Sequence, residues 1–431
     1  TSTTALTSTT ALTSTTALTS TTALASKMAL ASKMALACVA EASAQEGFKE
    51  AREAFLIGVA KKDADAALEA LEKLRAFDDA EVANFLIDRG LTHEDMEVYK
   101  ESERLLRLLE SDAAQAAVGL AARKRKSWEL RADCARVLAL YHNGRSFETL
   151  TELIDDKHWL VRSEAIRGLS MIREHRSVEL LIARMQKESG RLLEDISDAL
   201  KHMTHQGIPA DAARWKSWWE TTGKELDLPP EDASDPTTAR RKLGTAVKQG
   251  LYGVVVSERV VFVLDISGSM TAGTDLEGSR HVIATRELVR VLENQIGPDS
   301  EFNIVAFADQ VLRLAPKLQK GKGKSIKKAI EFVQALKPGG ETNAYGALKI
   351  AFLDREVDTI YLLSDGSPTV GDETIPALIR RHVLEWNRYR GVKIHCIGFF
   401  PGDARNQDKA EARTFLTELA HDNRGRYTEI D

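Results

Sequence analysis

The chain has 431 residues, of which 43% are hydrophobic and 29% are charged, a length and composition that suit two or three water-exposed domains. Its formal net charge of −5 argues against a protein built mainly to bind nucleic acid. The three cysteines fit neither a zinc-site spacing nor a disulfide framework, and no run of about 20 uninterrupted apolar residues predicts a membrane-spanning helix.

The first 45 residues have low complexity. Residues 1–24 repeat Thr-Ser-Thr-Thr-Ala-Leu four times, and two copies of Ala-Ser-Lys-Met-Ala-Leu follow. The leucines of this repeat share no single face of a helix, so we expect residues 1–45 to be a leader rather than a folded domain. Ala42-Ser43-Ala44 has the small-x-small form of a signal-peptidase site. This pattern favours export to the periplasm or the cell surface, with a cytoplasmic location as the alternative.

Residues 46–225 show helical periodicity throughout. Apolar residues follow i, i+3 and i+4 spacing, and no proline occurs before Pro209. The helical segments that end at Leu138, Leu169 and Leu200 are similar to one another and are spaced by 31 residues. An irregular helical bundle and a repeat array are both compatible with this pattern. An aromatic segment at residues 214–219 would cover the last apolar face of such an array.

One copy of the repeat contains a more specific motif. The pattern Asp-x-x-x-x-Val-Arg-x-x-Ala, formed by Asp156, Val161, Arg162 and Ala165, resembles the HEAT-repeat family. The resemblance covers at least residues 125–205. It implies helix pairs that stack into a curved solenoid whose surface binds other proteins.

Residues 226–249 separate the helical region from the rest of the chain. Residues 226–238 contain three prolines and lack periodicity, which predicts a linker. A basic helix over residues 239–249 is expected to lead into the next domain.

Residues 250–431 alternate between strand and helix patterns. This alternation predicts a doubly wound, mostly parallel α/β sheet of Rossmann-like form with helices on both faces. Ligands bind such sheets at the carboxyl ends of the strands, near a topological switch point. Strands are expected at 254–256, 260–264, 302–307, 359–363, 393–399 and 427–428, and helices at 279–295, 324–336, 344–353, 373–387 and 405–420.

Oxygen-bearing side chains follow two of these strands and one glycine-rich loop. Asp265, Ser267 and Ser269 follow the strand at 260–264, Asp365 follows the strand at 359–363, and Thr342 ends the loop that begins at Pro338. Taken alone, the Asp-x-Ser turn is equally compatible with a helix cap. Because the three segments converge on one sheet edge, their oxygens suit a hard divalent cation such as Mg²⁺ or Ca²⁺.

This set of side chains resembles the metal-ion-dependent adhesion site of the von Willebrand factor A family, whose five motif positions correspond to Asp265, Ser267, Ser269, Thr342 and Asp365. The resemblance covers residues 250–431. It implies that the two serines and the threonine are close ligands of Mg²⁺, with Ca²⁺ or Mn²⁺ as alternatives. The two aspartates would lie behind these three ligands and would hold the water molecules that coordinate the metal.

The resemblance also implies a function, which is cation-dependent recognition of a protein partner whose Asp or Glu replaces a metal-bound water. Glu341 stands immediately before Thr342, where relatives often have a small residue, and adds negative charge. We therefore expect a binding or scaffold protein in a periplasmic or cell-surface assembly. The alternative is an intracellular adaptor of a partner ATPase, and either form could be a homo-oligomer.

Catalysis is not expected. Residues 321–325 resemble part of a phosphate-binding loop, but Leu318 stands where that motif needs glycine. Neither Ser267 nor Ser269 lies in the Gly-x-Ser-x-Gly turn of a hydrolase.

Overall fold

The computed structural model describes residues 32–33, 43, 45–141, 143–229, 238–274, 276, 278–400 and 409–431. Most of the predicted leader and most of the predicted linker therefore lie outside the described residues. The chain divides into two compact units, Thr1–Val118 and Gly119–Asp431. Among the helices in the described ranges, none combines the length and the apolar character that a membrane span requires.

The described part of the first unit is helical. Three aspartates, Asp63, Asp79 and Asp95, each accept a hydrogen bond from a backbone N–H in the first turn of the helix that follows, which fixes where that helix begins. After helical residues 45–61 the elements are α2 (Ala64–Leu74), α3 (Ala80–Phe85), the π-helical turn η1 (Leu86–Gly90), α4 (Met96–Arg107) and α5 (Asp112–Lys124), which continues into the second unit.

Helix pairs open the second unit, in agreement with the predicted array. Arg131 donates through Nε and Nη2 to the Asp156 carboxylate at 2.8 and 2.9 Å, and Arg162, 31 residues later, donates to Glu188 at 3.1 Å. These contacts join each copy of the repeat to the next. The helices are α6 (Trp128–Leu138), α7 (Gly144–Leu153), α8 (Trp159–Met171), α9 (His175–Met185), α10 (Gly190–Thr204), α11 (Ala212–Thr221) and the turn η2 (Gly223–Glu225).

The aromatic segment closes this array as predicted. Trp215 and Trp219 of α11 are buried, and the Trp219 indole donates to Glu179 of α9 at 3.1 Å. The last helix pair is therefore covered by α11.

A mixed, mostly parallel sheet follows. Its strand order is β1-β8-β7-β6-β2-β3-β4, and β5 pairs with β3. The pairs that β3 forms with β4 and β5 are antiparallel, and the other pairs are parallel. The strands are β1 (Thr238–Arg241), β2 (Arg259–Asp265), β3 (Glu301–Phe307), β4 (Val311–Arg313), β5 (Gln319–Lys320), β6 (Thr359–Ser364), β7 (Lys393–Phe399) and β8 (Tyr427–Ile430).

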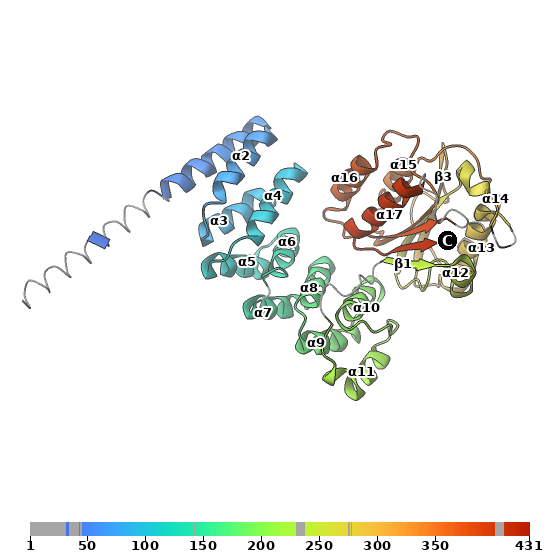
Figure 1. Cartoon of the computed structure of the whole chain (residues 1–431), viewed down its shortest axis with the longest axis horizontal. Coiled ribbons are helices and arrows are strands. Elements are labelled where there is room, and N and C mark those ends of the chain that lie inside the picture. The colour runs from blue at the N-terminus through green and yellow to red at the C-terminus, as the bar shows by residue number, and fades with distance from the viewer. Residues whose placement is uncertain are drawn as a thin grey trace, which may run out of the picture. The chain divides into compact units, whose positions relative to one another are not determined.

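Helices cover both faces of the sheet, as Figure 1 shows. Along the central strand β2, Phe262 and Leu264 pack with the helices of one face, whereas Val261 and Val263 pack with those of the other. Burial on both sides explains why β2 is a continuous apolar run. One face carries α12 (Leu243–Gln249), α13 (Arg280–Asn294) and α14 (Gly323–Ala335), and the other carries α15 (Ala344–Ala351), α16 (Pro376–Asn387) and α17 (Ala410–Asp422).

Two local predictions are wrong. Residues 254–256 form no strand, because the Val255 N–H donates to the Gln295 side chain at 2.8 Å and Val254 is 74% exposed. The helix expected from residue 239 begins only at Leu243, because residues 238–241 extend the sheet as β1 beside β8. The short strands β4 and β5 were not predicted.

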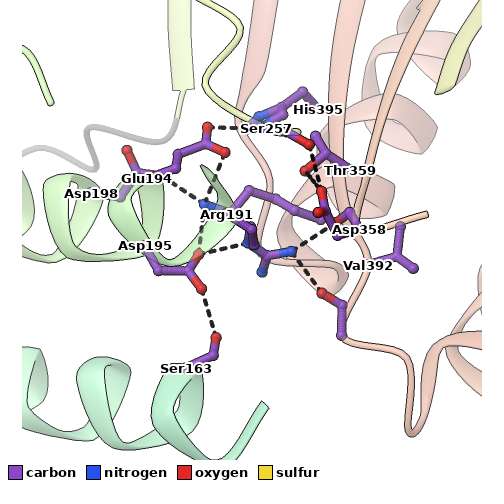
Figure 2. A network of polar contacts seen from close by, with 12 residues as sticks. Ser163, Arg191, Glu194, Asp195, Asp198, Ser257, Asp358, Thr359, Val392 and His395 are labelled. Carbon is purple, nitrogen blue, oxygen red and sulfur yellow. Dashed lines mark hydrogen bonds and ion pairs between the residues drawn. The ribbon is translucent and has the colours of Figure 1, made fainter. Parts of the chain in front are cut away.

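Within the second unit, α10 lies against the amino-terminal edge of the sheet (Figure 2). Arg191 donates through Nη1 to the backbone oxygen of Asp358, which directly precedes β6, at 2.8 Å and to that of Gly391, two residues before β7, at 2.7 Å. Lys393 Nζ, at the start of β7, lies 3.0 Å from Asp195 and 2.9 Å from Asp198. We call these hydrogen bonds and ion pairs, together with the ion pairs described next, the amino-edge network.

Further ion pairs extend the amino-edge network toward β8. Glu194 of α10 lies 3.2 Å from His395 and 3.2 Å from Arg426, and Glu164 of α8 binds Arg424. At Gly391, where φ is +60°, an added Cβ atom would lie 2.4 Å from a Leu160 methyl carbon, so glycine permits this close approach.

Repetition in the array supplies part of the amino-edge network. Asp133, Glu164 and Asp195 occupy the same position in successive copies, 31 residues apart. Glu164 binds Arg424, Asp195 binds Lys393, and the charge of Asp133 acts on Tyr389, whose pKa is raised mainly by burial. We call these three acids the acidic ladder.

Candidate metal-binding site

The predicted site lies at the opposite, carboxyl-terminal edge of the sheet. From β2 the chain crosses to β3 on one side and later returns to β6 on the other side, which makes β2 a topological switch point. Asp265 is the last residue of β2 and Asp365 directly follows β6, and both carboxylates are fully buried.

Asp265 organises the turn that follows β2. Its Oδ1 accepts a hydrogen bond from the Ser267 backbone N–H at 2.8 Å, and its Oδ2 accepts one from Ser364 Oγ at 2.5 Å. Both oxygens are therefore engaged, and they hold the serine-bearing turn against the end of β6.

The two predicted serines connect this turn to Asp365. Ser267 Oγ and Ser269 Oγ lie 3.1 Å apart, and Ser269 Oγ donates to Asp365 Oδ1 at 2.5 Å. The second oxygen of Asp365 accepts a hydrogen bond from Arg280 Nη1 at 2.6 Å. Four of the five predicted residues thus form one connected group.

Thr342 is brought to the same place by the glycine-rich loop. Thr342 Oγ1 and Ser269 Oγ lie 3.6 and 4.0 Å from the position that a Cβ atom on Gly366 would occupy. The loop is fixed because the Gly340 oxygen accepts from the Gly268 N–H at 2.8 Å. Gly340 has φ +81°, and an added Cβ would lie 2.2 Å from Asp309 Oδ2, so this position requires glycine.

Glu341 stands exposed at the rim of the group. Thr369 Oγ1 accepts a hydrogen bond from the Thr342 N–H at 2.9 Å and donates to Glu341 Oε2 at 2.9 Å. Asp309 Oδ1 accepts from the Glu341 N–H at 2.8 Å. The departure noted in the sequence therefore places a carboxylate beside Thr342 and leaves the Thr342 hydroxyl out of this contact.

The electrostatics of the group suit a cation. Burial, together with the negative charge of Asp365, raises the pKa of Asp265 to about 6, and hydrogen bonds from Ser364 and Ser267 only partly offset this rise. A divalent cation near both carboxylates would relieve their repulsion, and the surrounding donors are all oxygens, as Mg²⁺ prefers. The residues present therefore fit the cation that the family resemblance implies.

The donor set differs from that of a carboxylate-rich or zinc-type site. Within the described ranges, no group of three or more His, Cys, Asp or Glu side chains is arranged to hold a metal. A cation at the carboxyl edge would depend on hydroxyl oxygens and water in addition to Asp265 and Asp365.

Four residues of the group escaped the sequence analysis. Ser364 and Thr369 are hydroxyl residues near Asp365 in the sequence, and their position beside the end of that strand could have indicated that they belong to the site. Arg280 and Asp309 reach the group from other elements, at sequence distances that no motif prescribes.

Comparison with known families agrees with this architecture. Residues 116–201 match the HEAT repeats family, and residues 260–367 match the von Willebrand factor type A domain family. The latter range contains all five predicted site residues.

Among curated proteins, the chain is 28% identical to human von Willebrand factor A domain-containing protein 3B over 172 residues, which is 40% of this chain and 12% of that protein. It is 33% identical to human inter-alpha-trypsin inhibitor heavy chain H4 over 183 residues, which is 39% of this chain and 18% of that protein. The chain thus matches less than a fifth of the length of either relative.

Among solved structures, the chain resembles a von Willebrand factor type A protein from Catenulispora acidiphila, with 20% identity and a TM-score of 0.33 over 41% of this chain and 39% of that one.

Proposed function

Since this chain carries a von Willebrand factor type A domain after HEAT repeats, we propose that it is a divalent-cation-dependent protein-binding or scaffold protein. One observation carries the proposal. Two buried carboxylates and the hydroxyl-bearing residues Ser267, Ser269 and Thr342 gather at the carboxyl edge of the sheet.

In this proposal the hydroxyls of Ser267, Ser269 and Thr342 are the close protein ligands of Mg²⁺. Asp265 and Asp365 lie behind these ligands. They accept hydrogen bonds from the Ser267 N–H and the Ser269 hydroxyl and thereby orient the serine turn. Ca²⁺ or Mn²⁺ would suit the same oxygen donors.

Such a site binds rather than reacts. With few carboxylates close to the cation, its positive charge is incompletely neutralised, and Mg²⁺ keeps exchangeable waters. An Asp or Glu of a protein partner can take the place of one water and complete the coordination with a charged ligand. No covalent step is involved.

The repeat array supports the sheet at the edge opposite the proposed site. The amino-edge network joins α8 and α10 to the strands whose far ends carry the site. We propose that the array presents the carboxyl edge to the partner and offers a second protein-binding surface of its own.

Calorimetry with Mg²⁺ tests the proposal on wild type and Asp265→Ala. We expect a saturable heat of binding for wild type and none for the variant, with both proteins folded by circular dichroism. Equal heats from the two proteins would refute a metal site at Asp265.

Where the protein acts depends on the leader. We propose export with cleavage after Ala44, which lies outside the described residues. Mass spectrometry of the mature amino terminus in the native host would detect this cleavage, and a chain that retains residues 1–44 would contradict it.

A further inference from the structure

We infer that Arg280 sets the electrostatic balance of the proposed metal site: it weakens binding of the cation and strengthens binding of a carboxylate to the site once the cation is bound. This inference rests on the proposed function. It concerns a residue that lies outside the five-residue motif and was not expected from the sequence.

Arg280 is placed for this role by the start of α13. Ser279 accepts a hydrogen bond from the Val282 N–H and so fixes the first turn of the helix, and the Arg280 side chain that follows is 4% exposed. Its Nη1 donates to Asp365 Oδ2 at 2.6 Å, while Ser269 donates to the other oxygen of the same carboxylate.

The two carboxylate oxygens of Asp365 have different partners. Oδ1 reaches the serine turn, where the cation is proposed, whereas Oδ2 is held by the guanidinium. Arg280 therefore orients Asp365 so that it acts through Ser269, and the geometry disfavours bidentate contact of this carboxylate with a metal.

The charge of Arg280 also matters because the guanidinium is permanently ionised. The side chains of Asp265, Asp365 and Arg280 together carry one net negative charge, which Lys409 offsets because its Nζ donates to the Asp365 backbone oxygen at 2.7 Å. A divalent cation therefore makes the sum over these groups positive. Without Arg280 the same cation would only neutralise the two aspartates. The guanidinium thus repels the cation, but it preserves positive charge that attracts a partner's carboxylate.

A purely structural ion pair would behave differently. Loss of a pair that only supports the fold would weaken the binding of the cation and of the carboxylate together, or would leave both unchanged. The inference predicts opposite changes in the two affinities, and this opposition is what the experiment must find.

The test compares Arg280→Gln with wild type in the full chain. Mg²⁺ affinity is measured by calorimetry, and acetate affinity of the Mn²⁺-loaded protein is measured by water-proton relaxation, which falls when acetate displaces bound water. We expect Mg²⁺ to bind roughly tenfold more tightly and acetate several-fold more weakly, as one unit charge acting through a high effective dielectric would produce.

Two further variants serve as controls. Arg286→Gln removes an equal charge from an exposed position on the same helix and should leave both affinities unchanged. Arg280→Lys keeps the charge and should stay near wild type in both measurements. If Arg280→Gln fails to fold, Arg280→Met replaces it, since methionine is also uncharged but fills more of the buried space, and the same opposite changes in the two affinities are expected. A folded Arg280→Lys protein with either affinity substantially altered overturns the charge explanation.

The outcomes separate this inference from the proposed function. If wild type and Asp265→Ala bind Mg²⁺ equally, the proposed function fails. If wild type binds Mg²⁺ through Asp265 but Arg280→Gln changes both affinities in the same direction, or neither, the inference fails and the proposed function stands.

Discussion

The two edges of the sheet both contain buried carboxylates, but their surroundings differ. At the amino edge, Glu194, Asp195 and Glu164 face arginine, lysine and histidine side chains, and the pKa of each of these acids is lowered although burial alone would raise it. At the carboxyl edge, Asp365 is paired with Arg280, whereas Asp265 accepts hydrogen bonds from Ser267 and Ser364, and burial together with the negative charge of Asp365 raises the pKa of Asp265 to about 6.

The difference separates a structural network from a binding site. At the amino edge these acids are offset by basic side chains, and the pairs hold two elements together. At the carboxyl edge one guanidinium, that of Arg280, lies beside two buried acids, and the raised pKa of Asp265 is typical of a functional site. Buried acids therefore have opposite roles at the two ends of the same strands.

The largest expected effect comes from breaking the amino-edge network at Lys393, whose side chain is 3% exposed. Lys393→Met leaves Asp195 and Asp198 without this partner and should lower the free energy of unfolding by about 3–5 kcal/mol, measured by urea denaturation. The exposed pair of Lys320 with Glu301 is the control, since Lys320→Met should cost less than about 1 kcal/mol.

The Lys393→Met variant also tests whether the two edges of the sheet are independent. Because Lys393 begins β7 at the edge opposite the proposed metal site, a folded Lys393→Met protein should bind Mg²⁺ as tightly as wild type. A large loss of Mg²⁺ affinity would show that the two edges are not independent.

An intermediate effect concerns pH. Arg136 and Arg424 outweigh the effect of burial and hold the pKa of Glu164 well below its ordinary value of 4.5. The ionised side chain therefore stabilises the fold above about pH 4.5, and this contribution is lost as the pH falls toward the lower folded-state pKa.

Glu164→Gln tests this dependence. We expect the variant to be less stable than wild type by about 2–3 kcal/mol at neutral pH. The difference should shrink as the pH is lowered below about 4.5. Denaturation across pH would check this, with exposed Glu225→Gln as the matched control; a gap that stays constant would contradict the assignment.

The smallest expected effect is at the carboxyl edge. Thr369→Val removes the hydroxyl that accepts from the Thr342 N–H and donates to Glu341. We expect the Mg²⁺ affinity to weaken by about 1 kcal/mol with little change in the unfolding midpoint. Thr414→Val, on the exposed side of α17, should leave Mg²⁺ binding unchanged.

Much of the fold followed from local patterns in the sequence. The β-branched run of β2 and the apolar run of β6 each end in an aspartate, and the rule for parallel sheets then places both acids at one edge. Pro376 occupies the first position of α16, where the fixed backbone angle of proline is tolerated. These signals are local, or they depend on topology alone.

Other features escaped because their causes lie far away in the chain. Residues 254–256 have strand-like composition, but Gln295, which directly follows α13, accepts the hydrogen bond of the Val255 N–H through its side chain. Arg280 and Lys393 are single charged residues whose partners lie 85 and 195 residues away. Composition and periodicity carry no information about such partners.

The acidic ladder has a consequence for how this chain can change in length. An α-helix turns by about 100° per residue, so one residue inserted in α10 between Gly190 and Asp195 would swing this acid away from Lys393. Substitutions at exposed positions between Glu164 and Asp195 do not change the direction in which either acid points. Insertions of a whole 31-residue copy would preserve it too. The spacing of the repeat is therefore also the register in which the array and the sheet fit together.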